Sequence, residues 1–305
     1  MITESRREVR RSKTALLATS LRPEQWTKNL LLFAGLLFGG RLLEVGAVIT
    51  AMAGFAIFSA LSGATYLLND IWDREADRRH PLKQTRPIAS GQLDIGTGAW
   101  SAAILIAGAI GAAWLLSPRL AGIAAAYVGL LSFYSTTLKH MVIVDVLAIA
   151  GGFVLRAVAG AIAVDVPIGS WLLVCTTLLA LFLALSKRRH ELVLLGEDAS
   201  SHRRSLEHYS PYLLDQMIAV VTASTLIAYT IFATSADTAQ RLGTSRLVFT
   251  VPFVLYGIFR YLYLVHQRLG GGSPAEMFLT DRPLLLCVAL WACAVMLLMY
   301  SPVGR

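Results

Sequence analysis

Residues 47–77 read AVITAMAGFAIFSALSGATYLLNDIWDREAD, so a long apolar run passes directly into an acidic cluster. The apolar part has the length of a membrane-spanning helix, which takes about 20 residues. If the helix continues, steps of four bring Asn69, Asp73 and Asp77 onto one face, with Asp70 beside them. Carboxylates crowded in this way repel one another unless a cation lies between them.

Oxygen ligands of this kind suit Mg²⁺, which holds phosphorylated substrates with one or two carboxylates and water. We therefore predict a magnesium site made by Asn69, Asp70, Asp73 and Asp77. The cations directly downstream would contact the phosphates of such a ligand: Arg78, Arg79, His80, Lys83 and Arg86. The alternative is a solvated helix end with surplus charge, which this cationic segment disfavours.

The composition is that of a membrane protein. The chain has 305 residues, of which 56% are hydrophobic and 15% charged, whereas a soluble domain has about 25% charged residues. Apolar runs predict nine transmembrane helices, near 28–45, 47–68, 97–116, 120–138, 142–162, 170–186, 213–233, 247–265 and 283–301. The predicted fold class is all-α, a polytopic integral membrane protein.

Lysine and arginine set the predicted orientation. With the N-terminus inside, the inner side carries 20 of the 27 Lys and Arg residues and the outer side 5. This asymmetry follows the positive-inside rule and predicts a multi-pass protein of the inner (plasma) membrane. Its N-terminus and its long charged loops, 69–96 and 187–212, would be cytoplasmic. The net charge of +8 then reflects contact with anionic lipid, and no motif predicts a nucleic-acid partner.

The domain organisation is predicted to be simple. Residues 1–21 would form a cytoplasmic tail, and residues 22–305 a single transmembrane catalytic domain. Small residues such as Gly35 and Gly39 allow helices to approach closely, and they permit a homo-oligomer without specifying one. Long loops on one side only indicate that this side carries the function.

A second charged cluster follows the sixth predicted helix, where residues 186–191 read SKRRHE. Lys187, Arg188 and Glu191 share one face of a helix. An acidic stripe that holds Mg²⁺ and a basic stripe that holds phosphate oxygens would be complementary halves of a site for a phosphorylated ligand. The alternative is an ordinary basic patch after a transmembrane helix.

A third group of polar residues lies between these clusters. Tyr134 and Lys139 end the fourth predicted helix on the inner side, and Asp145 begins the fifth. Arg156 lies three turns deeper, where a charge costs about 2.5–3.5 kcal/mol, so it should face the bundle interior. Asp145 and Arg156 project in similar directions, which leaves two interpretations, an internal ion pair or a cationic substrate site above the Mg²⁺ site.

The pattern Asn-Asp-x-x-Asp-x-x-x-Asp at 69–77, followed by Arg-Pro-Ile at 86–88 and Gly91, resembles the first aspartate-rich motif of the UbiA superfamily of intramembrane prenyltransferases. The resemblance covers nearly the whole chain, beginning with Arg-Pro-x-x-Trp-x-Lys-Asn at 22–29. It implies a UbiA-like bundle and a Mg²⁺-dependent transferase whose polyprenyl substrate enters from the lipid. It also implies a substrate-binding role for Lys28.

The chain differs from the aromatic prenyltransferases of the superfamily in one motif, and this difference indicates a particular branch. The aromatic prenyltransferases of the superfamily carry a second DxxxD motif after the sixth helix, where this chain has KRxxE at 187–191. That pattern resembles the branch of decaprenyl-phosphate phosphoribosyltransferases, as do Leu-Lys-His at 138–140 and the segment at 155–160. A prenyl diphosphate needs two acidic motifs to hold its metals. Phosphoribosyl diphosphate also carries a 5-phosphate, which a Lys-Arg cluster suits better.

The resemblance therefore implies transfer of 5-phosphoribosyl from phosphoribosyl diphosphate to a decaprenyl-type polyprenyl phosphate, with release of diphosphate, for synthesis of a lipid-linked arabinose precursor. The predicted catalytic residues are Asp73, Asp77, Lys187 and Glu191. The predicted substrate-binding residues are Lys28, Lys83, Arg86, Tyr134, Lys139, Arg156, Lys187, Arg188 and Glu191. Two alternatives stay open, a prenyltransferase acting on an aromatic or other small acceptor and a non-catalytic membrane transporter.

Overall fold

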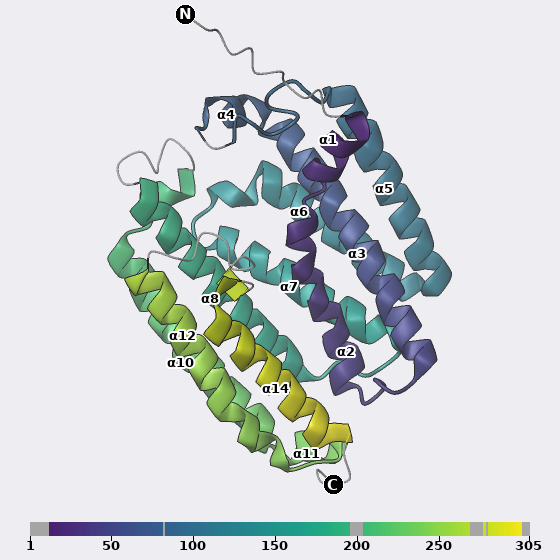
Figure 1. The fold of residues 1–305 in the computed structure, drawn as a ribbon, viewed down its shortest axis with the longest axis vertical. Helices are drawn as coiled ribbons and strands as arrows, with labels where there is room; N and C mark the ends of the chain where they lie inside the picture. Colours follow the sequence, from purple (N-terminus) through teal and green to yellow (C-terminus); the bar gives the residue numbers. More distant parts are fainter. Residues whose placement is uncertain (1–11, 82, 196–203, 269–276, 279, 301–305) are drawn as a thin grey trace, which may run out of the picture.

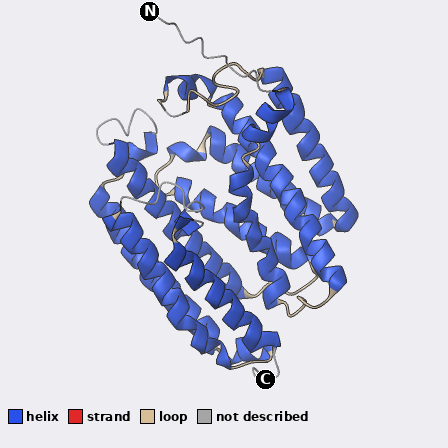
Figure 2. Cartoon of the chain, in the orientation of Figure 1, coloured by secondary structure: helices blue, strands red, loops and turns tan. Residues whose placement is uncertain are grey.

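The computed structural model describes residues 12–300 except 82, 196–203, 269–276 and 279 (Figure 1). Within these residues every regular element is a helix, as Figure 2 shows. The elements, with η marking 3₁₀ helices, are α1 (Lys13–Ser20), η1 (Pro23–Leu32), α2 (Phe33–Phe38), α3 (Val45–Trp72), α4 (Arg74–Arg79), α5 (Ile95–Leu116), α6 (Pro118–Thr136), η2 (Leu138–His140), α7 (Val144–Ala163), α8 (Ser170–Leu195), η4 (Arg204–His208), α10 (Pro211–Thr234), α11 (Ala236–Leu242), η5 (Arg246–Thr250), α12 (Val251–Gln267) and α14 (Arg282–Tyr300).

The all-α integral membrane fold is confirmed. Seven of the described helical segments are long and apolar enough to cross a membrane: α3, α5, α7, α8, α10, η5 with α12, and α14. The helix over the fourth predicted span, α6, is not among them, although it has 19 residues. The count of nine transmembrane helices therefore stays a prediction.

The first predicted span, 28–45, differs from the structure in its bounds, because the helical backbone runs from Pro23 to Phe38. The chain there forms the ten-residue η1 and the six-residue α2, and it turns before α3 begins. Gly40 in this turn has a φ of +73°, which glycine adopts without the steric cost that a side chain brings. The segment begins as a 3₁₀ helix, continues as an α-helix, and contacts α3 and α7.

η1 and α2 pack closely against α7. A Cβ atom added to Gly160 of α7 would lie 2.0 Å from the carbonyl oxygen of Leu32, and one added to Gly35 would lie 2.6 Å from the backbone nitrogen of Ala161. The two backbones therefore touch at a pair of glycines. This contact fixes η1 and α2 against the middle of the bundle.

The remaining helices form a closed sequence of neighbours. Each long helix packs against the next along the chain, from α3 through α5, α6, α7, α8, α10 and α12 to α14. The last helix then contacts the first ones, since the hydroxyl of Tyr300 donates to the carbonyl of Leu37 at 2.8 Å. Phe38 of α2 also lies against Trp291 of α14, with 6.3 Å between ring centroids.

The predicted tail, 1–21, contains a helix. Residues 1–11 lie outside the described residues, and α1 follows them. Ser12 caps this helix by accepting a hydrogen bond from the backbone of Ala15 at 3.2 Å, which satisfies an otherwise unpaired donor. Leu16 is buried, and Leu17 packs against a cluster that contains Ala64 and Leu67 of α3. Residues 13–20 of the predicted tail are therefore helical.

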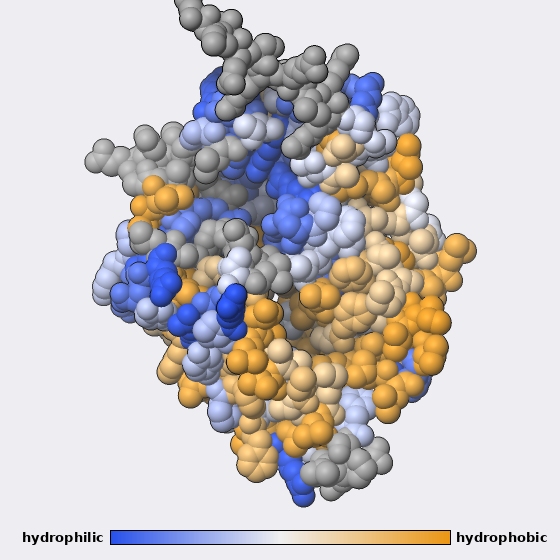
Figure 3. Space-filling model, in the orientation of Figure 1, coloured by the Kyte–Doolittle hydropathy of each residue, from blue (hydrophilic) through white to orange (hydrophobic). Residues whose placement is uncertain are grey.

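Polar and apolar residues divide the visible surface. Figure 3 shows hydrophilic residues gathered in the upper half of the face, where they line a hollow, and mainly hydrophobic residues below. In the same view, α4 and the ends of the helices near it lie at the top (Figure 1). The charged motifs of the sequence therefore gather at one end of an apolar bundle.

Gly160→Ala tests the backbone contact. We expect it to lower the free energy of unfolding by about 1–3 kcal/mol, because the added methyl group meets backbone atoms that cannot rotate away. Thermal unfolding of the detergent-solubilised protein measures the change. The matched control is Gly108→Ala on α5, where an added Cβ meets nothing within 4 Å. Equal melting temperatures for the two variants would contradict this account of η1.

Candidate active site

The acidic motif straddles a break between two helices. The last residue of α3 is Trp72, Asp73 has a non-helical ψ of 5°, and α4 begins at Arg74. The hydrogen bonds nevertheless keep their four-residue spacing, from Asp73 N to Asn69 O at 2.9 Å and from Asp77 N to Asp73 O at 2.7 Å. The predicted stripe of acidic side chains therefore survives, although the predicted continuous helix does not.

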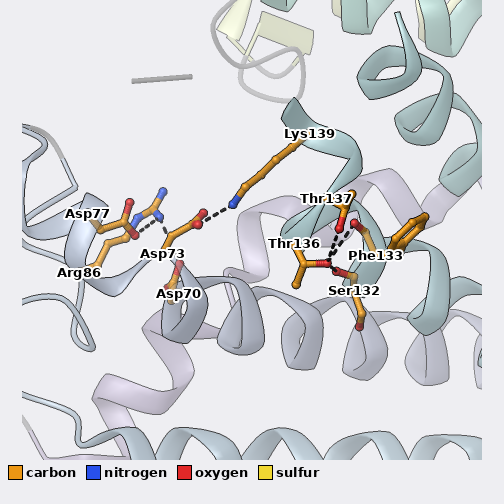
Figure 4. Close-up of polar contacts among 9 residues, drawn as sticks. All are labelled: Asp70, Asp73, Asp77, Arg86, Ser132, Phe133, Thr136, Thr137 and Lys139. Carbon is orange, nitrogen blue, oxygen red and sulfur yellow. Dashed lines mark hydrogen bonds and ion pairs between the residues drawn. The ribbon is translucent and has the colours of Figure 1, made fainter. Parts of the chain in front are cut away.

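Arginines hold two of the carboxylates at the centre of the site. Arg86 Nη1 donates to Asp70 Oδ1 at 3.1 Å and to Asp77 Oδ2 at 2.6 Å, as Figure 4 shows. Arg22 also contacts Asp70. Asp70 and Asp77 are buried, so their charges need these partners. The arginine that we expected to cover a diphosphate lies between carboxylates instead.

A lysine from another segment holds the third carboxylate. Lys139 Nζ lies 2.5 Å from Asp73 Oδ1, reaching across from η2 (Figure 4). The backbone carbonyl of Lys139 accepts a hydrogen bond from Ser205 Oγ at 3.1 Å. The short η2 helix therefore fixes a cation above the acidic motif. Lys83 is half-buried in the turn that leads to Arg86.

The second cluster forms on α8, which continues to Leu195, well past its predicted end at 186. Lys187 Nζ lies 3.8 Å from Glu191 Oε1, and Arg188 also contacts Glu191. Arg188 Nε donates to Asp145 Oδ2 at 2.8 Å, and its Nη2 donates to the hydroxyl of Tyr134 at 3.1 Å. Both Arg188 and Asp145 are buried. Arg188 therefore anchors this end of α8 with all three of its nitrogens.

Tyr209 completes the anchor. Its hydroxyl donates to Asp145 Oδ1 at 2.9 Å and accepts from the backbone nitrogen of Ile143 at 2.7 Å. Ile143 has a φ of +68°, a strained value for a β-branched residue. Burial raises the pKa of Tyr209 to about 12, so the phenol keeps its proton at neutral pH and remains a donor. This hydrogen bond supports the turn into α7.

Tyr134 and Lys139 connect the two clusters. Tyr134 lies near the end of α6 and bonds to Arg188, and Lys139 follows in η2 and bonds to Asp73. The structure therefore brings the acidic motif, the basic cluster and the residues between them to one end of the bundle, as the sequence predicts.

Arg156 has neutral partners. It is 5% exposed, and its Nε donates to Asn29 Oδ1 at 2.7 Å. Its other nitrogens donate to the carbonyl of Gly152 at 3.0 Å and to the hydroxyl of Tyr127 at 2.5 Å. Asp145, the partner considered from spacing, bonds to Arg188 and Tyr209. Arg156 does face the bundle interior, as its membrane depth requires.

Sequence reasoning missed the role of Arg22 at the site. It has a φ of +51°, and strained backbone of this kind clusters at functional sites. Asn29 and Tyr127 were also missed as partners of Arg156. The Arg-Pro-x-x-Trp-x-Lys-Asn segment at 22–29 was the available signal, since it contains both Arg22 and Asn29.

The residues of the acidic motif fit Mg²⁺. The carboxylates of Asp70 and Asp77 already converge on one nitrogen of Arg86. In the described part of the chain, no three His, Cys, Asp or Glu side chains form a ready metal cage. Mg²⁺ in proteins commonly uses one or two carboxylates and takes its other ligands from phosphate and water.

Comparison with known proteins identifies the family of this chain. A family model described as the UbiA prenyltransferase family matches residues 29–280. The decaprenyl-phosphate phosphoribosyltransferase of Corynebacterium glutamicum is 33% identical over 288 residues, which make up 92% of this chain and 86% of that protein. The protein of the same name from Mycobacterium tuberculosis is 32% identical over 280 residues, covering 90% of this chain and 91% of its own length.

A solved structure shares the fold. The structure of a UbiA homolog from Archaeoglobus fulgidus bound to DMAPP and Mg²⁺ has a TM-score of 0.71 and 17% sequence identity, and the match covers 93% of this chain and 98% of that one. The helical membrane fold, the family model and the names of the relatives together define an integral membrane enzyme of the transferase class. The chain belongs to the UbiA prenyltransferase family, and the predicted family and enzyme class are thereby confirmed.

Tyr209→Phe tests the anchor of the second cluster. We expect the free energy of unfolding to fall by about 1.5–3 kcal/mol, because a buried carboxylate loses a hydrogen-bond donor. Chemical or thermal unfolding in detergent measures it. Tyr212→Phe is the control, because Tyr212 is 75% exposed. If the control were destabilised as much as Tyr209→Phe, the hydrogen bond to Asp145 would not be the cause.

Proposed function

We propose that this protein transfers a 5-phosphoribosyl group from phosphoribosyl diphosphate to a polyprenyl phosphate of decaprenyl type, with Mg²⁺ and with release of diphosphate. The observation that carries the proposal is the composition of the second cluster. Where a second metal-binding acidic motif would serve a prenyl diphosphate, α8 presents Lys187 beside Glu191 and the anchored Arg188. The names of the two bacterial relatives support the same reaction.

In the proposed site, the acidic residues would bind the metal and the neighbouring cations would bind phosphate. Asn69, Asp70, Asp73 and Asp77 would hold Mg²⁺, and the bound ion would neutralise the leaving diphosphate. When the carboxylates turn to the metal, their present partners become available to phosphate oxygens: Arg22, Arg86 and Lys139. The site can therefore take up metal and diphosphate together with little change in its net charge. Lys83 would add a further cation at the rim.

The second cluster would orient the donor. Lys187 is the exposed cation of the cluster, with a side chain that is 41% exposed, and it would bind the 5-phosphate. Arg188, which is buried, would hold Glu191 and Tyr134 in place through its contacts with both side chains. Glu191 would accept from the ribose hydroxyls, which carboxylates bind well.

The reaction needs no strong general base. An oxygen of the acceptor phosphate, already anionic at neutral pH, forms a bond to C1 of the ribose. The bond from C1 to the diphosphate oxygen breaks, and its electron pair leaves with the diphosphate. Catalysis would come from positioning and from charge neutralisation on the leaving group. We further propose that the site faces the cytoplasm at the inner membrane, as the distribution of lysine and arginine indicates.

Asp73→Asn should reduce Mg²⁺-dependent transfer by about 100-fold or more, because the site loses a charged ligand for the metal. The assay counts radiolabel that moves from phosphoribosyl diphosphate into the organic phase when a polyprenyl phosphate is present. Glu75→Gln is the matched control, because Glu75 lies in the same motif with a side chain that is 67% exposed. Normal transfer by folded Asp73→Asn protein would remove the metal assignment. Transfer from a prenyl diphosphate to a small acceptor instead would replace the proposed reaction.

Lys187→Met should raise the KM for phosphoribosyl diphosphate by about tenfold, which is the effect of losing roughly 1.4 kcal/mol of binding. The KM for the polyprenyl phosphate should stay close to that of the native protein. Arg189→Met serves as the control, because this neighbouring cation pairs with Asp215 on α10. A donor KM that does not change in Lys187→Met would assign the 5-phosphate to another residue.

A further inference from the structure

A row of cationic side chains leads from the acidic motif into the bundle. Arg22 contacts Asp70, and its guanidinium lies 4.7 Å from the centroid of the Tyr66 ring. The hydroxyl of the same Tyr66 lies 3.5 Å from Lys28 Nζ. Tyr66 lies one helical turn before Asp70 on α3, so the contacts of Tyr66 lead from Arg22 at the acidic motif to Lys28.

The innermost cation of the row is held in place but not neutralised. Arg156 bonds to Asn29, Gly152 and Tyr127, all through uncharged oxygen atoms. Its guanidinium also lies 4.7 Å from the centroid of the Tyr127 ring. In the described part of the chain, Arg156 has no carboxylate partner within ion-pair distance. A buried cation in a membrane domain is costly, and an anion beside it would repay that cost.

Within the described part of the chain, Lys28 uses little of its hydrogen-bonding capacity. An ammonium group has three donors, and among the described residues the contact of Lys28 Nζ is the long one to Tyr66. Glu24, one turn earlier in the chain, is exposed. Lys28 directly precedes Asn29, which accepts from Arg156. Two adjacent cations, one fixed and one with unused donors, match the double charge of a phosphate monoester.

We infer that Lys28 binds the phosphate of the polyprenyl phosphate acceptor. Arg156 positions Lys28 through its hydrogen bond to Asn29 and adds positive charge beside the phosphate. This inference rests on the proposed function and assigns one substrate to one part of the site. The donor is water-soluble, and its diphosphate belongs at the acidic motif. The acceptor carries an apolar tail, so its phosphate is the one that can reach an intramembrane cation.

The test measures binding of farnesyl phosphate, a short polyprenyl phosphate, to the full-length protein in detergent with EDTA and without donor. Lys28→Met should weaken this binding by about tenfold or more, while Lys28→Arg should restore most of it. Lys13→Met on the exposed surface of α1 is the control and should bind normally. Farnesol, which lacks the phosphate, should bind equally to native protein and Lys28→Met. Unchanged farnesyl phosphate affinity in folded Lys28→Met would overturn the inference.

Asn29→Asp separates anion binding from structural support. The new carboxylate has nearly the shape of the amide, would pair with Arg156, and would accept from Ser59 Oγ, which now accepts from Asn29 Nδ2 at 3.1 Å, so the fold should keep its melting temperature. The same carboxylate would neutralise the guanidinium, so farnesyl phosphate should bind several-fold more weakly. Full affinity in a stable Asn29→Asp variant would show that the charge of Arg156 serves packing alone, against the inference.

Kinetics distinguish this inference from the proposed function. If Lys28→Met weakens farnesyl phosphate binding but the native protein transfers no phosphoribosyl group, the phosphate site stands and the proposed function fails. If the native protein does transfer the group and Lys28→Met raises the donor KM in place of the acceptor KM, the proposed function stands and the acceptor site is wrong.

Discussion

A charge inside an apolar helix bundle must be neutralised or hydrogen-bonded, and this requirement organises one end of the protein. The carboxylates of the acidic motif take their partners from three separate segments, with Arg22 before η1, Arg86 before α5, and Lys139 in η2. A second set of pairs ties α7 to α8. The same ion pairs that join the helix ends also bring together the groups suited to a metal and a diphosphate, so stability and function share one set of contacts.

Much of this arrangement could be predicted because its signals are local. Apolar length reports burial in lipid whatever the neighbouring helix is, so the long helices from α3 to α14 matched their predicted positions within a few residues, apart from the extended α8. Four-residue spacing predicted the acidic stripe, and its backbone hydrogen bonds keep that spacing. The family was predictable for the same reason, since its motif lies within residues 69–77.

What the sequence could not predict depends on contacts between distant residues. Hydropathy suggested a helix over 28–45, whereas the helical backbone runs from Pro23 to Phe38, with Gly35 packed against the backbone of α7. Spacing suggested Asp145 as the partner of Arg156, whereas packing gives Asp145 to Arg188. Arg22 reaches Asp70 across 48 positions, and no periodic pattern encodes such a pair. The sequence therefore predicted which residues form the cluster on α8 but not which distant residues they bond to.

The bond from Tyr300 to the carbonyl of Leu37 joins the last helix to one of the first. Chains are made from the N-terminus and inserted in that order, so Leu37 enters the membrane long before its partner exists. Loop-closure entropy also delays contacts of such large sequence separation. The earlier helices must therefore remain in the membrane without this contact until α14 is inserted, and only then can the first and last described helices pack together.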